Sequence, residues 1–255
     1  QSTPPTYGEF VYYLVLAKYF KLKRKKVEII LISNFNKKSF FRILDKKKIF
    51  LFKQELKKLS LFYMKKNLIE YKSFDNFIND YKSKKKNILF NFFILKKFKI
   101  YQTFLPLLNL ILQNEKKFFI KKLKFSEKNQ NRKNLKKIKP YIAWHVRRNY
   151  KWGTYNNTSD EILKIADYLK LQKKKYKILL LSDRNGCIWA RKILKKYKNI
   201  YYSDKYANGF TEAAKALINS NYFFQYKGGG LTTIAYFSNV PYKIISYINP
   251  HDKKF

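Results

Sequence analysis

Cysteine and long apolar runs are scarce in this chain. Its one cysteine among 255 residues is Cys187, which excludes a framework of intrachain disulfides and is typical of a reducing compartment. No apolar run approaches the roughly 20 residues that a helix needs to cross a bilayer. No Asp-x-Asp pattern or His/Cys cluster indicates a metal site. We therefore expect a cytoplasmic protein, soluble or peripheral at the inner face of the membrane.

Acidic residues are also few, with 16 against 57 basic ones, for a formal charge of +41. Only seven of the basic residues are arginines, so the excess is lysine, accompanied by much Asn, Ile, Phe and Tyr. These five residue types share A/T-rich codons, and we interpret most of the charge as a coding bias on solvated surfaces. The alternative is a polyanionic partner, either nucleic acid or an anionic membrane surface. No RRM, KH, zinc or helix-turn-helix signature is present, so no specific nucleic acid is expected.

Glycine divides the chain into two halves, since Gly8 stands alone and the next glycine is Gly153. We predict domains at 1–135 and 136–255, separated by a polar segment that Pro140 closes. In the first, "GEFVYYLVLAKYF" predicts a helix and "VEIILIS" a strand, followed by Lys-rich segments of helical character. The chain starts on "QSTPPTYGEF" without Met, and we expect that a preceding N-terminal strand is missing.

The second half alternates predicted strands and helices at short loop lengths. The strands are "YIAWHV", "YKILLLS", "NIYYS", "YFFQY" and "YKIIS", and the helices between them are "DEILKIADYLKLQ", "CIWARKILKKY", "TEAAKALIN" and "LTTIAYFS". This order predicts an α/β fold, a Rossmann-like parallel sheet with helices on both faces. Ligands bind such sheets outside the carboxyl ends of the strands, so the residues that follow each strand are the candidates for function.

Three adjacent glycines follow the strand "YFFQY". In a chain with seven glycines, this turn predicts bare backbone N–H groups at the start of a helix, which suit a phosphate group. The alternative is a tight turn that needs glycine for geometry alone. The turn matches neither a Walker A motif nor GxGxxG. The candidate donor-binding residues here are Gly228, Gly229, Gly230, Leu231, Thr232 and Thr233.

Arginines also stand at strand ends, where they are more informative than lysines in this chain. Arg147 and Arg148 follow the first strand of the second half, and Arg184 follows the next strand. The planar guanidinium group suits bidentate phosphate contacts. Because successive strand residues alternate sides, at most one of the adjacent pair should face the ligand. His145 is interpreted as a buried strand histidine that bonds to neighbouring backbone.

Several carboxylates occupy similar positions but have structural alternatives. Ser182 and Asp183 end one strand, and "SD" recurs at 203–204; such groups can accept hydrogen bonds from a ribose or a base, or can start turns and cap helices. Glu212 begins a later helix and is a further donor-site candidate, or it only favours the helix dipole. "TSDE" at 158–161 predicts a capping box.

In the first half, Gly8 and Glu9 begin the first predicted helix; Gly8 is a candidate for substrate or donor binding, and Glu9 is the candidate catalytic residue. A carboxylate at this position could act as a general base if burial raises its pKa toward the working pH. The alternative is an ordinary first-turn glutamate without a catalytic function.

Taken together, these residues resemble glycosyltransferases of the GT-B type. "HVRRNYKWGT" resembles the nucleotide-sugar motif of core fucosyltransferases, although Asn149 stands where that motif has an acidic residue. "YGEF" and "GGGLTTIAYFSNVP" are similar to elements of lipopolysaccharide heptosyltransferases, with Glu9 in place of Asp. The resemblance implies two Rossmann-like domains, the first on the acceptor side and the second binding a nucleoside-diphosphate sugar.

The resemblance further implies an inverting, metal-independent transfer to a glycan or glycolipid acceptor in cell-envelope glycan biosynthesis. A GDP-sugar is favoured as the donor, and no cofactor is expected. Two other hypotheses stay open: a basic nucleic-acid-binding or ribosomal protein of an A/T-rich genome, and an inactive nucleotide-binding homologue.

Overall fold

The computed structural model divides the chain into two compact units, residues 1–123 and 124–255. It describes residues 7–24, 27–32, 46–65, 67–72, 76–77, 79–80, 123–125, 133–148, 156–172 and 175–245. The division lies ahead of the predicted boundary at 135/136, because residues before that boundary already belong to the second unit. Leu135 is buried there, and the N–H of Phe125 donates to the carbonyl of Phe237 at 2.6 Å.

The first unit contains a strand–helix–strand motif preceded by a helix. Its elements are α1 (Tyr7–Leu22), β1 (Ile29–Ile32), α2 (Lys46–Met64) and β2 (Leu68–Tyr71). β1 and β2 pair in parallel, with Ile29 opposite Leu68, and α2 connects them. α1 and β1 confirm the sequence prediction for this region. β2 was not predicted, because "LIEY" is short and lies among lysines that blur its pattern.

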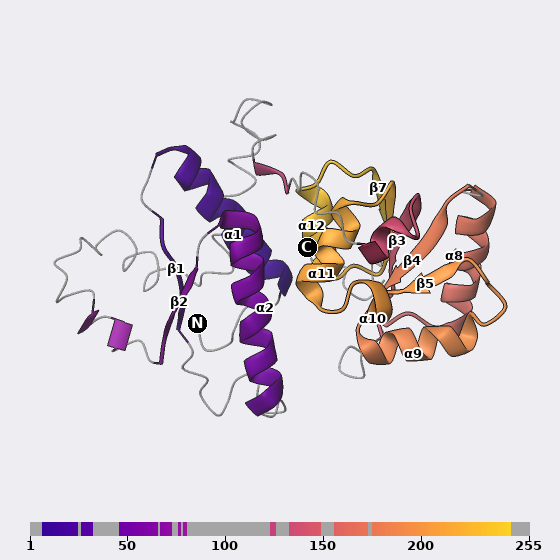
Figure 1. Cartoon of the computed structure of the whole chain (residues 1–255), viewed down its shortest axis with the longest axis horizontal. Helices are drawn as coiled ribbons and strands as arrows, with labels where there is room; N and C mark the ends of the chain where they lie inside the picture. Colours follow the sequence, from indigo (N-terminus) through magenta and orange to yellow (C-terminus); the bar gives the residue numbers. More distant parts are fainter. Residues whose placement is uncertain are drawn as a thin grey trace, which may run out of the picture. The chain divides into compact units, whose positions relative to one another are not determined.

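The second unit consists of alternating strands and helices (Figure 1). Its elements are α7 (Lys133–Lys136), β3 (Tyr141–His145), α8 (Ser159–Gln172), β4 (Lys177–Leu181), α9 (Arg184–Ile193), β5 (Ile200–Tyr202), α10 (Ser203–Tyr206), α11 (Phe210–Ile218), β6 (Tyr222–Tyr226), α12 (Gly230–Tyr236) and β7 (Tyr242–Ile245). All five predicted strands and all four predicted helices of this half are present. The four-residue helix α10 lies where a loop was expected.

The five strands form one parallel sheet in the order β5-β4-β3-β6-β7. Numbered within the unit, this is the 3-2-1-4-5 order of a Rossmann-like sheet. The direction of strand succession reverses between β3 and β6, which pair with each other. In doubly wound sheets such a reversal leaves a crevice outside the carboxyl ends of the two strands, where ligands bind; we call the corresponding place here the β3–β6 crevice.

Helices cover both faces of this sheet, as predicted for the α/β class. On one face, Trp144 and Phe224 pack into a core shared with α8 and α9. On the other face, the hydroxyl of Tyr141 donates to the carbonyl of Ala216 in α11 at 2.7 Å. In the inner strands β3, β4 and β6 the apolar residues are buried against both layers, which explains why these strands are continuous apolar runs in the sequence. Within the described part of the chain, no helix has the length and apolar character that crossing a membrane requires.

Candidate functional site

The crevice between β3 and β6 brings two predicted motifs together. β3 ends at His145 and leads into Arg147 and Arg148, while β6 leads into the glycine triplet. In the sheet register, His145 stands opposite Gln225. The loop that follows β3 and the turn that follows β6 therefore begin side by side at the strand-order reversal.

The glycine turn has a backbone that side chains rarely adopt. Gly228 has φ +64° and Gly229 has φ +147°, and α12 begins at Gly230. A Cβ built on Gly228 would meet nothing within 4 Å, whereas one on Gly229 would lie 2.6 Å from Cε1 of His145. Gly229 is thus needed for close packing against the imidazole, and Gly228 faces open space. Because α12 is only seven residues long, its dipole is not taken to bind an anion; the candidate anion donors are the N–H groups of the turn.

The remaining predicted residues of this turn divide into buried and half-buried side chains. Those of Leu231 and Thr233 are buried. Thr232 is half-buried, and its hydroxyl donates to Oε1 of Gln225 at 3.0 Å. Thr232 therefore fixes the amide of Gln225, a residue that the sequence did not single out.

The two adjacent arginines differ in exposure and in contacts. Arg148 is exposed, and its guanidinium carbon lies 4.8 Å from the ring centroid of Trp189 in α9. Arg147 is half-buried, and Asn157 holds its backbone: the N–H of Arg147 donates to the Asn157 side chain at 2.7 Å, and its carbonyl accepts from the Asn157 N–H at 2.8 Å. The charge of Arg147 acts on the imidazole of His145.

His145 is kept neutral by its surroundings. Burial lowers the pKa of its imidazole from 6.5 to about 4, and the positive charge of Arg147 contributes to that decrease. The predicted bond from this histidine to neighbouring backbone is wrong for Nδ1. That atom is buried and has no hydrogen-bond partner among the residues that the structure describes.

Lys227 ties the turn after β6 to the loop after β3. Its ammonium group donates to the carbonyl of Asn156 at 2.9 Å and lies 2.8 Å from Oε1 of Glu161 at the start of α8. We name these contacts the Lys227 clasp. Glu161 also forms the predicted capping box, since it accepts from the Thr158 N–H at 2.9 Å and its own N–H donates to the Thr158 hydroxyl at 3.3 Å. The sequence missed Lys227 because nothing distinguishes it from the other lysines.

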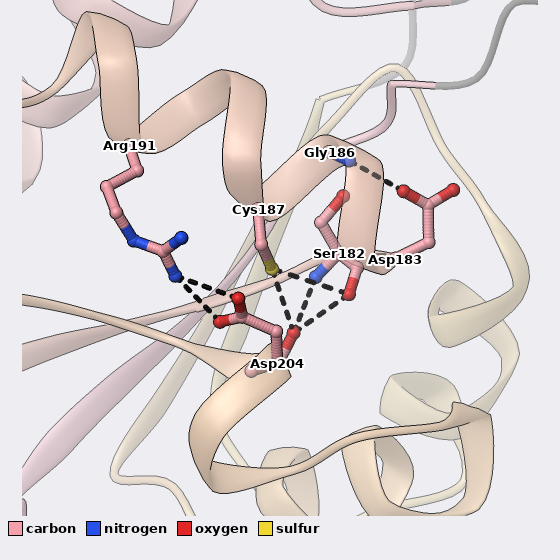
Figure 2. A network of polar contacts seen from close by, with 7 residues as sticks. Ser182, Asp183, Gly186, Cys187, Arg191 and Asp204 are labelled. Atoms are coloured by element: carbon pink, nitrogen blue, oxygen red, sulfur yellow. Dashed lines mark hydrogen bonds and ion pairs between the residues drawn. The ribbon is translucent and has the colours of Figure 1, made fainter.

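The ends of β4 and β5 form a separate polar network (Figure 2). The Ser203 hydroxyl donates to the Ser182 carbonyl at 2.8 Å and accepts from the Ser182 N–H at 3.0 Å. Asp183 caps α9 by accepting from the Gly186 N–H at 2.7 Å. These contacts favour the structural reading of Ser182 and Asp183.

The same network closes around two further side chains. The guanidinium of Arg191 donates to both carboxylate oxygens of Asp204 at 2.9 Å, which ties α9 to α10. Burial raises the pKa of the Cys187 thiol, whose sulfur lies 3.4 Å from the Ser203 hydroxyl. Cys187 is therefore a protonated packing residue.

Four other predicted residues lie in the first turns of α9, α11 and α1. Arg184 is exposed in the first turn of α9. Glu212 stands in the first turn of α11, 3.5 Å from the ammonium of Lys215. Gly8 and Glu9 lie in the first turn of α1, as expected, but the Glu9 side chain is outside what the structure describes. No cluster of three or more His, Cys, Asp or Glu side chains suited to a metal occurs in the described ranges.

No protein-family model matches the chain, and no curated protein matches it. Among solved structures, the chain is similar to a protein of Listeria monocytogenes assigned as a UDP-N-acetylglucosamine 2-epimerase, at 13% sequence identity and a TM-score of 0.36. The similarity covers 93% of this chain but 61% of that protein. The fold assignment therefore depends on the strand order and the helical layers of the second unit.

Proposed function

We propose that the chain is a glycosyltransferase whose second unit binds a nucleoside-diphosphate sugar at the carboxyl ends of β3 and β6. The observation that carries the proposal is the placement of Arg147 and the glycine turn on both sides of the strand-order reversal. Arg147 supplies a charge for phosphate, Gly228 leaves open space for its approach, and the turn supplies backbone donors.

In the proposed reaction, the oxygen of an acceptor hydroxyl attacks the anomeric carbon of the sugar. The bond from that carbon to the diphosphate breaks, and the proton of the hydroxyl passes to a carboxylate, for which Glu9 is the candidate. Arg147 and the N–H groups of the turn stabilise the departing diphosphate. Such donors act where negative charge develops, which assists the leaving group without a metal. A GDP-sugar is the favoured donor, from the resemblance of "HVRR" to the fucosyltransferase motif.

Binding of a nucleoside diphosphate without metal is the direct test. GDP, UDP, ADP and CMP, with their sugar conjugates, are titrated in EDTA while the melting temperature is followed. We expect a nucleoside diphosphate to raise it. If no nucleotide shifts the transition at millimolar concentration, the donor-site proposal is overturned.

Gly228 offers a matched pair of variants for the same assay. Asn and Asp both tolerate a φ near +64°, and a Cβ at this position meets no atom within 4 Å. Gly228→Asp places a negative charge where the phosphate approaches and should weaken binding about tenfold more than Gly228→Asn, which corresponds to ~1.4 kcal/mol. Equal affinities of the two variants would exclude an anion at this turn.

The base is tested by Glu9→Gln, which keeps the size of the side chain and removes its proton acceptor. Donor binding should survive, while single-turnover sugar transfer falls about 10²–10⁴-fold. Transfer at the wild-type rate would remove Glu9 from the mechanism without affecting the donor site.

The alternative of a nucleic-acid-binding protein is favoured by the charge of +41. It predicts that the logarithm of the affinity for RNA falls steeply and linearly with the logarithm of the salt concentration, because binding releases counterions from the RNA. Strong RNA binding of this kind, together with no response to nucleotides, would favour that alternative.

A further inference from the structure

Two buried nitrogen atoms beside the glycine turn have no hydrogen-bond partner among the described residues. They are Nε2 of Gln225 and Nδ1 of His145, from residues that stand opposite each other in β6 and β3. Gln225 is 0% exposed. A buried amide or imidazole nitrogen without a partner destabilises the folded state, because it loses the hydrogen bond that it made to water in the unfolded chain. An unsatisfied buried group in a folded protein calls for an explanation, and a bound ion or ligand that supplies the missing partner is one.

Both atoms lie against Gly229. The point where a Cβ of Gly229 would stand is 3.1 Å from Nε2 of Gln225 and 3.2 Å from Nδ1 of His145. The amide orientation is set from the other side, since Oε1 of Gln225 accepts from the Thr232 hydroxyl. Nε2 is therefore turned toward Gly229, and it can only donate.

The chemistry of the two atoms selects the partner. Nε2 of Gln225 is a donor, and the neutral ring of His145 donates from Nδ1 in one of its two tautomers. A group that accepts from both must be an oxygen with two lone pairs available. The neighbouring charge of Arg147 favours an anionic oxygen over a neutral one.

We propose that Gln225 and His145 form a two-donor site for a phosphoryl oxygen beside Gly229. The inference rests on the proposed function, which places a diphosphate at this crevice, and it names the residues that select the phosphoryl group. Gly228 and Gly229 have positive φ and lack a side chain, so the glycine turn can shift to admit the oxygen. When the ligand binds, its oxygen accepts a hydrogen bond from Nε2 of Gln225, so that this donor is satisfied.

Gln225→Met separates this role from a structural one. Methionine has a similar length and no polar hydrogen, so the free variant should melt at or above the wild-type temperature. Its affinity for GDP and for inorganic pyrophosphate, measured by calorimetry, should fall about 10–100-fold, which is one to two steps of ~1.4 kcal/mol. A purely structural Gln225 predicts the opposite pattern: a lower melting temperature and unchanged affinity.

Two further variants complete the experiment. Thr232→Val removes the hydroxyl that orients Gln225 and should weaken affinity less than Gln225→Met; it gives an independent measure if the methionine variant does not fold. Ser220→Ala is the control, because its hydroxyl bonds to the carbonyls of Leu217 and Tyr222 at the amino end of β6. It should lower stability and leave affinity unchanged.

The outcomes distinguish this inference from the proposed function. If the wild type binds GDP and both Gln225→Met and Thr232→Val bind it with the same affinity as the wild type, the two-donor site is overturned and the proposed function is unaffected. Gln225-dependent binding of pyrophosphate without any response to nucleotides supports the site and overturns the proposed donor. Binding of neither phosphate compound to the wild type overturns both.

Discussion

Replacing Lys227 by methionine should destabilise the second unit by about 3 kcal/mol. The ammonium group makes two charge-assisted hydrogen bonds, to Asn156 and Glu161, and bonds of this kind contribute about 1.5–3 kcal/mol each. The loss stays at the lower end of the 3–5 kcal/mol typical of a broken buried pair, because the Glu161 side chain is 25% exposed and can be hydrated. Lys227 has φ +67°, and lysine and methionine bear the same backbone strain there.

Urea unfolding and thermal melting measure this loss. With about 3 kcal/mol removed, the melting temperature of a unit of this size should fall by on the order of 10 °C. Nucleotide affinity should fall as well, since the clasp holds the loop that carries Arg147. Lys227→Arg keeps the charge and should recover part of both quantities, although its planar group fits a site built for an ammonium poorly.

A double-mutant cycle with Glu161→Gln isolates the contact between the two charges. The coupling energy should exceed about 1 kcal/mol, above the 0.2–1 kcal/mol typical of exposed ion pairs. If Lys227→Met changes stability by less than about 0.5 kcal/mol, as an ordinary surface substitution does, the clasp does not hold the two loops together and the reasoning above is wrong.

Three further outcomes follow from the same unit. The pKa of His145 is lowered to about 4 in the folded state, so its contribution to stability is present above pH 6.5, and about 3 kcal/mol of stability is lost as the pH falls toward 4. In pH-dependent unfolding, His145→Phe should not show this loss. Asp183→Ala should cost about 1 kcal/mol through the lost cap on α9 while nucleotide affinity is kept, and a large loss of affinity would return Asp183 to the binding site. Gly229→Ala should lower stability by at least about 2 kcal/mol, from positive φ and the clash with His145, and a variant as stable as the wild type would contradict the packing described.

The sheet of the second unit was predictable because its strands are short apolar runs and its helices are bounded by recognisable signals. "TSDE" forms the predicted capping box at the start of α8. The start of α9 was placed late, because Asp183 at a strand end suits both a ligand contact and a helix cap. Its carboxylate accepts from the helix backbone, and only the geometry decides between these readings. In the first unit, the uniform Lys-rich composition concealed β2.

The pair of His145 and Gln225 could not be predicted from the sequence, since they are brought together only by the register of β3 and β6. A histidine in a strand is usually satisfied by its neighbours, and a glutamine in "YFFQY" carries no motif. Lys227 was concealed in a different way. Fifty-seven basic residues make every lysine look like part of a solvated surface, and burial beside Glu161 is visible only in the folded unit.

The geometry of the glycine triplet separates two reasons for using glycine. At Gly229 a side chain would strike the imidazole of His145, so packing alone explains the residue. At Gly228 packing explains nothing, because a Cβ there meets no atom within 4 Å. Asparagine tolerates the φ of +64°, and this chain is rich in asparagine and poor in glycine. A glycine in open space, at the crevice where Arg147 also stands, is what a turn requires when a phosphate must approach its backbone closely.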